Sequence, residues 1–149
     1  MESLRYDDDD VMRLKDGSAT IKRVVLTNPG DGLGAKRFGE WSAVDILAHV
    51  AKMAEVTRER LERCRREDAP EIASVDSGAM LDERDPHALA TRIWAAHAAI
   101  VELMMEPGVA KRPGTHPEWG RVPAEHFAAY HARHADEHFR EVAQAFPPK

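Results

Sequence analysis

The sequence predicts an all-α protein, an antiparallel up-down four-helix bundle that forms a single domain over residues 1–149. Three features support this prediction. Apolar residues recur with a period near 3.6 in four segments, Gly- and Pro-rich breaks separate the segments, and no stretch is typical of a strand. With 43% hydrophobic and 32% charged residues, the composition is that of one ordinary globular domain.

The first helix is expected within residues 8–27. Its weak point is the pair Gly17 and Ser18, where the helix could break or kink. The aspartate run at residues 7–10 is expected to be a solvated helix start, because carboxylates suit the positive end of the helix dipole. Residues 28–34 (NPGDGLG) are expected to form a loop. The candidate core positions of this helix are Val11, Leu14, Ile21, Val24 and Val25.

The second helix is expected to begin after Ser42. This residue is a good N-cap, and Asp45 is placed to satisfy free amides of the first turn. The helix covers residues 43–67, with an apolar first half and a charged second half, and a long polar connection follows over residues 68–85. The basic residues near its end suit the negative end of the dipole and are expected to be solvated. These are Arg63, Arg65 and Arg66.

The third helix is expected to start near Asp85, with Pro86 in the tolerated first turn, and to stop at a Pro-Gly pair. Its predicted buried residues are Leu89, Ile93, Trp94, Ala96, Ile100, Val101, Leu103 and Met104. Residues 111–122 are expected to be a loop. Pro123 then opens the fourth helix, which ends before residues 146–149 (FPPK).

Charge and composition argue against several partners. A formal net charge of −5 leaves no basic field to gather phosphates, so no nucleic-acid partner is expected. The N-terminus lacks the apolar core of a signal peptide, and no window approaches the length of a membrane span. We therefore expect a cytoplasmic protein with no membrane partner. Cys64 is the single cysteine, so no internal disulfide can form, and it is expected to be a plain thiol.

Four of the eight histidines fall within residues 126–138 of the last helix. One face of that helix carries, in order, Phe127, His131, His134, His138 and Val142. Both ends of this stripe are apolar, so the face is expected to point into the bundle, where each imidazole needs a partner. A divalent metal ion is one partner that satisfies several converging histidines at once.

His49 is the predicted second source of a ligand, because it lies in the most apolar part of the second helix. Taken alone, a histidine in that setting is more often a core residue bonded to a carbonyl, and this alternative stays open. The other histidines are interpreted as non-ligands, except that the loop carrying His116 could close over the site. They are His87, His97, His116 and His126, and the tryptophans are interpreted as packing residues.

Three stretches carry a family resemblance: WSAVDILAHVAKMAEVTRERL, HPEWG and YHARHADEHFREV. In this order and at these separations they resemble the DinB/YfiT-like superfamily of metalloenzymes, over residues 38–144. The resemblance implies an up-down four-helix bundle, often a homodimer, in which three histidines hold a divalent metal ion with open positions. Carried over to this sequence, the metal ligands are His49, His134 and His138, and His131 lies next to them without being a ligand.

The resemblance also implies a function, a divalent-metal-dependent enzyme. Some members of the superfamily are thiol S-transferases or thiol-dependent isomerases, so the expected partners are a small thiol and an electrophilic small-molecule substrate. For the metal we expect zinc or nickel ahead of manganese or iron. Asp136 and Glu137, which lie beside the ligands, are interpreted either as a base or orienting group or as solvated surface.

Two alternatives stay open at this stage. The first is a non-catalytic protein that binds a metal or a small ligand, such as a stress-response factor. The second is a structural helical dimer whose buried histidines only form hydrogen bonds and titrate.

Overall fold

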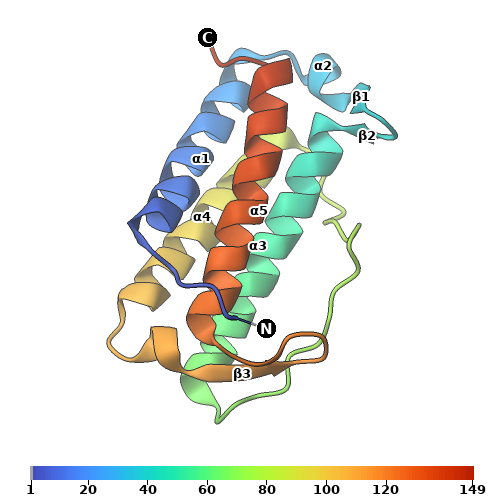
Figure 1. Ribbon diagram of the computed structural model, residues 1–149. Coiled ribbons are helices and arrows are strands. Elements are labelled where there is room, and N and C mark those ends of the chain that lie inside the picture. Colours follow the sequence, from blue (N-terminus) through green and yellow to red (C-terminus); the bar gives the residue numbers. More distant parts are fainter. Residues whose placement is uncertain (1) are drawn as a thin grey trace.

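The structure, a computed structural model, describes residues 2–149 and is a bundle of four long helices (Figure 1). These helices are α1 (Asp8–Thr27), α3 (Ala43–Arg66), α4 (Pro86–Met105) and α5 (Ala124–Ala145). A short helix, α2 (Gly30–Gly34), and a 3-10 turn, η1 (Val109–Lys111), lie in the connections. The predicted four-helix bundle is confirmed.

The four helices form a ring, in which α1 and α3 each pack against both α4 and α5. Within this ring α3 and α4 run in the same direction, opposite to α1 and α5 (Figure 1). Ion pairs lie at both ends of the parallel helices α3 and α4. Asp45 pairs with Arg84 near the two helix starts, and Arg65 pairs with Glu106 near the two helix ends. The direction is set by the connection over residues 67–85, which returns along the outside of the bundle before α4 begins (Figure 1).

Hydrogen-bonded caps fix the starts of α3 and α4, where both helices were predicted to begin; the cap by Ser42 was predicted, whereas the cap by Asp85 was not. The Ser42 hydroxyl accepts from the amide of Asp45 at 3.0 Å, and the Asp45 carboxylate accepts from the amide of Ser42 at 2.9 Å. At the start of α4, the Asp85 carboxylate accepts from the amide of His87, and Pro86 occupies a first-turn position.

The start of α1 differs from the expectation of a solvated aspartate run. Asp7 does cap the helix, through a reciprocal pair of hydrogen bonds with Asp10. Asp10, however, is fully buried and pairs with Arg13 and Arg133, so for this residue the expectation was wrong. The reason is a long-range partner: Arg133 comes from α5, which the helix dipole argument does not consider.

α1 continues without a break through Gly17 and Ser18. A Cβ atom at position 17 would lie 2.5 Å from Cδ2 of Phe139, so glycine permits the close approach of α5. The Ser18 hydroxyl donates to the carbonyl of Leu14 at 2.7 Å, a local bond that a helix accommodates.

Two short antiparallel hairpins occupy the connections, where no strand was predicted. β1 (Lys36–Phe38) pairs with β2 (Trp41–Ser42), and β3 (Pro113–His116) pairs with β4 (Gly120–Pro123). α2 replaces most of the loop expected at residues 28–34, the β3–β4 hairpin replaces the loop expected at residues 111–122, and the β1–β2 hairpin lies just before α3. The strands have no more than four residues each, too few for an alternating pattern to identify them.

The apolar character of α4 corrects the expectation that no window approaches the length of a membrane span. Its 20 residues include a window of mean hydropathy 1.3, so by length and composition alone it could cross a membrane. A helix in the core of a bundle passes the same test, and 44% of that window is buried, including Leu89, Ile93 and Ile100. Trp94 was predicted to be buried but is 45% exposed, with the Lys22 ammonium 5.3 Å above its ring.

Candidate metal centre

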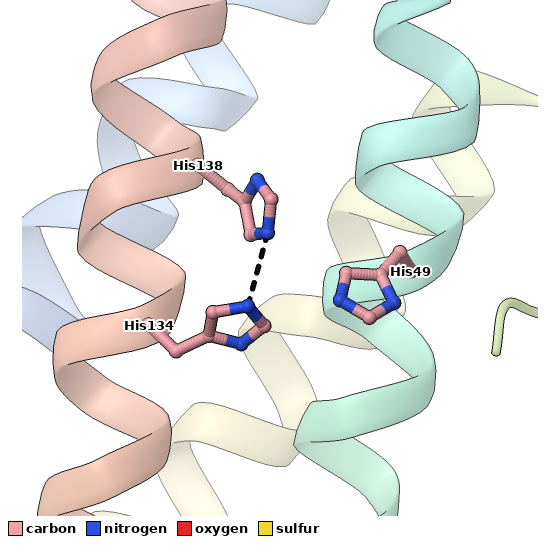
Figure 2. A group of neighbouring side chains, drawn as sticks. All are labelled: His49, His134 and His138. Atoms are coloured by element: carbon pink, nitrogen blue, oxygen red, sulfur yellow. Dashed lines mark hydrogen bonds between the residues drawn. The ribbon is translucent and has the colours of Figure 1, made fainter. Parts of the chain in front are cut away.

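Three imidazole rings meet between α3 and α5 (Figure 2). His49 comes from α3, and His134 and His138 come from successive turns of α5. We call this group the histidine triad. One nitrogen from each ring lies within 4.8 Å of the other two, and Nε2 of His134 is 3.1 Å from Nε2 of His138. The structure therefore brings together the three residues that the sequence singled out as metal ligands.

The spacing of these nitrogens fits one metal ion. Two imidazole nitrogens at ~2.1 Å from a tetrahedral ion lie ~3.4 Å apart, so a small adjustment of the rings would be sufficient. The i,i+4 spacing on α5 points both of its rings the same way.

Two of the rings make hydrogen bonds on the side that faces away from the triad, and these bonds fix which ring nitrogen carries the hydrogen. Nδ1 of His49 lies 2.6 Å from the carbonyl oxygen of Ala79, and Nδ1 of His138 lies 2.9 Å from a carboxylate oxygen of Glu141. Both oxygens can only accept, so each Nδ1 carries a hydrogen, and in the neutral ring each Nε2 keeps a lone pair directed into the triad. Histidines that bind metals are commonly held by such a carbonyl or carboxylate.

The tautomer of the third ring, that of His134, follows from the tautomers of the other two rings. Because Nε2 of His138 has the lone pair, the hydrogen in its 3.1 Å contact belongs to Nε2 of His134. Nε2 of His134 and Nε2 of His138 can both act as ligands only after that proton has moved to Nδ1 of His134. Burial, with added repulsion from His138 and His49, lowers the pKa of His134 to about 4, and burial also lowers the pKa of His49. Both rings are therefore neutral at pH 7, as metal binding requires.

A cleft of about 440 Å³ opens beside the triad, lined by His49 and His134. Its other walls come from residues 74–77 of the long connection and from the β3–β4 hairpin, which contributes His116 and Trp119. A second hollow, of about 350 Å³ between α1 and α5, contains none of the triad. The triad is thus reachable by a small molecule from one side.

A second histidine group lies in the core, sealed from solvent. His131 and His97, which we call the sealed pair, have their Nε2 atoms 2.9 Å apart. Nδ1 of His97 faces the Ser18 hydroxyl at 2.9 Å and the Leu14 carbonyl at 3.2 Å. Since that carbonyl can only accept, Nδ1 of His97 carries its hydrogen and Nε2 accepts from His131. His131 points inward as expected, and its partner is His97 rather than a metal ligand.

The other predicted candidates lie outside the triad. Nδ1 of His116 accepts from the amides of Glu118 at 3.1 Å and Trp119 at 3.3 Å, and its ring stacks on Trp119 with centroids 4.2 Å apart. Nδ1 of His126 accepts from the amide of Leu4 at 2.9 Å, and His87 is exposed. His116 therefore forms a wall of the cleft rather than part of the triad.

The structure also shows which acidic residue near the triad contacts one of its rings. Asp136 pairs with Arg140 at 3.0 Å, and Glu137 is exposed, so the solvated-surface interpretation fits both. The carboxylate that does contact a triad ring is Glu141, which the sequence reasoning missed. Its signal was present as the spacing of three residues from His138, which places it on the same helix face. Cys64 is fully buried and burial raises its pKa to about 11, as suits an unreactive thiol.

No family model matches the chain, and no curated protein matches it. Among solved structures, the chain is similar to YfiT from Bacillus subtilis, described as "a probable metal-dependent hydrolase with an unusual four-helix bundle topology". The TM-score is 0.71 at 19% sequence identity, over 92% of this chain and 85% of that chain. At this identity the likeness establishes the fold alone. The YfiT-like four-helix bundle predicted from the sequence is confirmed.

Proposed function

We propose that this protein is a divalent-metal-dependent enzyme, with His49, His134 and His138 as metal ligands and the adjoining cleft as substrate site. The observation that carries the proposal is the convergence of three imidazoles, two of which line a cleft. Three protein ligands with an open side are typical of catalytic rather than structural metal sites. The similar fold of YfiT, itself described as metal-dependent, supports the same proposal.

The residues of this chain would hold the ion and set its surroundings. Ala79 and Glu141 fix the orientation of two ligand rings, which keeps their Nε2 lone pairs in place. Zinc or nickel is proposed ahead of manganese or iron, because a given set of nitrogen ligands generally binds the former pair more tightly. A bound divalent ion supplies Lewis acidity, which lowers the pKa of a coordinated water or thiol towards neutrality.

For the reaction, we propose that an activated water or small thiol attacks an electrophilic small molecule. The description of YfiT as a hydrolase favours water, whereas the resemblance of the sequence motifs favours a thiol, in S-transfer or thiol-dependent isomerisation. The single cysteine is buried away from solvent, so the thiol in the second case is a separate molecule. The homodimer and the cytoplasmic location stay predictions from the sequence.

The test is turnover by the metal-loaded protein against a panel of esters and amides, and against thiol–electrophile pairs. We expect activity to fall at least about a hundredfold on chelation, to return with added metal, and to be lost in His134→Ala. His87→Ala is the matched control, because this exposed histidine lies away from the triad. Turnover that persists after complete metal removal would overturn the mechanism. Full metal occupancy without turnover on any substrate would favour the non-catalytic metal-binding alternative.

A further inference from the structure

We propose that the substrate carries an anionic group, a carboxylate or a phosphate, and that Arg60 binds this group inside the cleft. This inference rests on the proposed function in one respect, because it takes the reacting centre of the substrate to lie at the histidine triad. The anion site itself is defined by Arg60 and its surroundings.

Arg60 is a buried guanidinium on the helix that also provides His49. Its exposed fraction is 9%, and it lines the same cleft as His49 and His134. Burial lowers its pKa, but an arginine keeps its charge in proteins. A buried charge is normally paired with an opposite charge, because removing it from water is costly.

The expected partner of Arg60 is missing from residues 2–149. Its Nη2 donates to the carbonyl of Ala73 at 2.8 Å, and its guanidinium lies 5.6 Å from the centre of the Phe127 ring. No carboxylate within those residues lies within 4 Å of it. A guanidinium has five N–H donors, so most of them have no partner in the part of the chain that the structure describes. An oxyanion from a ligand would satisfy both the charge and the donors, and arginine matches carboxylate and phosphate in two-point geometry.

A second donor, His116, lies in the wall of the same cleft and is 6% exposed. Its Nδ1 accepts two backbone amides, so in the neutral ring the hydrogen is on Nε2. Arg60 and His116 line the same cleft, where burial and then the charge of Arg60 lower the pKa of His116 and Glu118 raises it. The acidic residues of the cleft, Asp76 and Glu118, are both exposed. The buried part of the cleft is therefore positive.

The dimensions of the cleft limit the size of the substrate. About 16 Å of helix rise separates the Cα atoms of His49 and Arg60, and helical side chains tilt towards the N-terminus, which brings the guanidinium towards His49. A cleft of about 440 Å³ is in the range of small-molecule sites. We therefore infer a small molecule whose anionic group is several bonds away from its reacting centre.

The direct test is a titration followed by NMR on the Nε–Hε signal of Arg60 in the wild-type protein, with and without bound zinc. The probes are inorganic phosphate, phenylacetate and, as the neutral control, phenylacetamide. We expect a saturable shift of the Arg60 signal with at least one anion and none with the amide. The two anion arms distinguish a phosphate from a carboxylate. If neither anion moves the signal in zinc-loaded protein, the inference is overturned while the metal proposal stands. If the protein proves unable to bind zinc and the Arg60 signal still shifts with an anion, the anion site is supported and the metal proposal fails.

Variants give a second, quantitative measurement. Arg60→Gln is compared with Arg58→Gln, an exposed arginine of the same helix, so that both lose one charge. We expect the dissociation constant for the anion to rise about tenfold or more in Arg60→Gln, to recover in part in Arg60→Lys, and to stay unchanged in Arg58→Gln. Equal weakening by both glutamine variants would indicate general charge attraction and overturn the assignment. Zinc occupancy is expected to be unchanged in each variant, and the wild-type titration decides the question if Arg60→Gln does not fold.

Discussion

Two groups of histidines, whose members on α5 begin one turn apart at His131 and His134, use the same side chain in different ways. In the sealed pair, each Nε2 atom has the other as its partner, and Ser18 and Leu14 complete the hydrogen bonds of His97. In the histidine triad, contacts with Ala79 and Glu141 occupy the outer nitrogens and leave inner nitrogens directed at one another.

The difference teaches how to recognise a metal site in a bundle rich in histidine. Burial does not distinguish the two groups, since His49 and His131 are each 3% exposed. What differs is the number of rings that converge, two in the sealed pair and three in the triad, and whether a cleft reaches them. Three convergent rings beside a cleft favour a cation, whereas two rings that satisfy each other inside the core favour a structural role.

Removal of a triad ring is the strongest way to test this comparison. We expect His134→Ala to weaken zinc binding by roughly a thousandfold or more, about 4 kcal/mol, because one of three ligands is lost. His97→Gln is expected to bind zinc as the wild type does, since Gln can keep a hydrogen bond with His131. Isothermal titration calorimetry provides both dissociation constants. Equal zinc affinity in His134→Ala and wild type would show that the triad is not the metal site.

The pH dependence of stability tests the sealed pair. Burial lowers the pKa of His97 to about 4, from 6.5 in an unfolded chain. The unfolded state therefore takes up a proton first as the pH falls, so the stability from the neutral ring is complete above about pH 6.5 and is lost towards pH 4. Between pH 7 and pH 4.5 we expect His97 to account for roughly 2 kcal/mol of lost unfolding free energy.

Urea unfolding of metal-free protein at the two pH values measures this loss. His97→Gln is the control, because glutamine does not titrate, and its stability should fall by correspondingly less than that of the wild type. The same pH dependence in both proteins would mean that His97 is not held neutral by the fold.

The smallest expected effect concerns the carboxylate behind the triad. We expect Glu141→Gln to weaken zinc binding by about tenfold, since the amide still contacts His138 but no longer raises the basicity of the ring. Glu137→Gln is the matched control, because Glu137 is exposed on the same helix and has no contact with the triad. Zinc titrations of the two variants give the comparison. A tenfold loss in both would point to general charge rather than to the contact with His138.

The helices could be predicted from the sequence because their signals are local. Caps such as Ser42 with Asp45, and Asp85 before Pro86, mark helix starts within a few residues, and the apolar period marks their buried faces. His49, His134 and His138 were found because an inward stripe and the family resemblance coincided. Their convergence is now observed, while their role as metal ligands stays a prediction.

The features that were missed depend on partners far away in the sequence. The burial of Asp10 depends on Arg133, and the pairing of His131 depends on His97 from another helix. The parallel direction of α3 and α4 likewise depends on the path of residues 67–85, which carry no periodic pattern. Arg60 was not singled out because nothing local distinguishes a buried arginine from the exposed ones near it.

The outer connection, residues 67–85, has a consequence for how this protein can diversify. It supplies the carbonyl of Ala79 to His49 and that of Ala73 to Arg60, and it also forms one rim of the cleft. Those two contacts use backbone atoms, so they tolerate changes of side chain at both positions. Selection can therefore reshape the entrance to the cleft by substitutions along one surface segment, while the four helices and the groups they present are inherited intact.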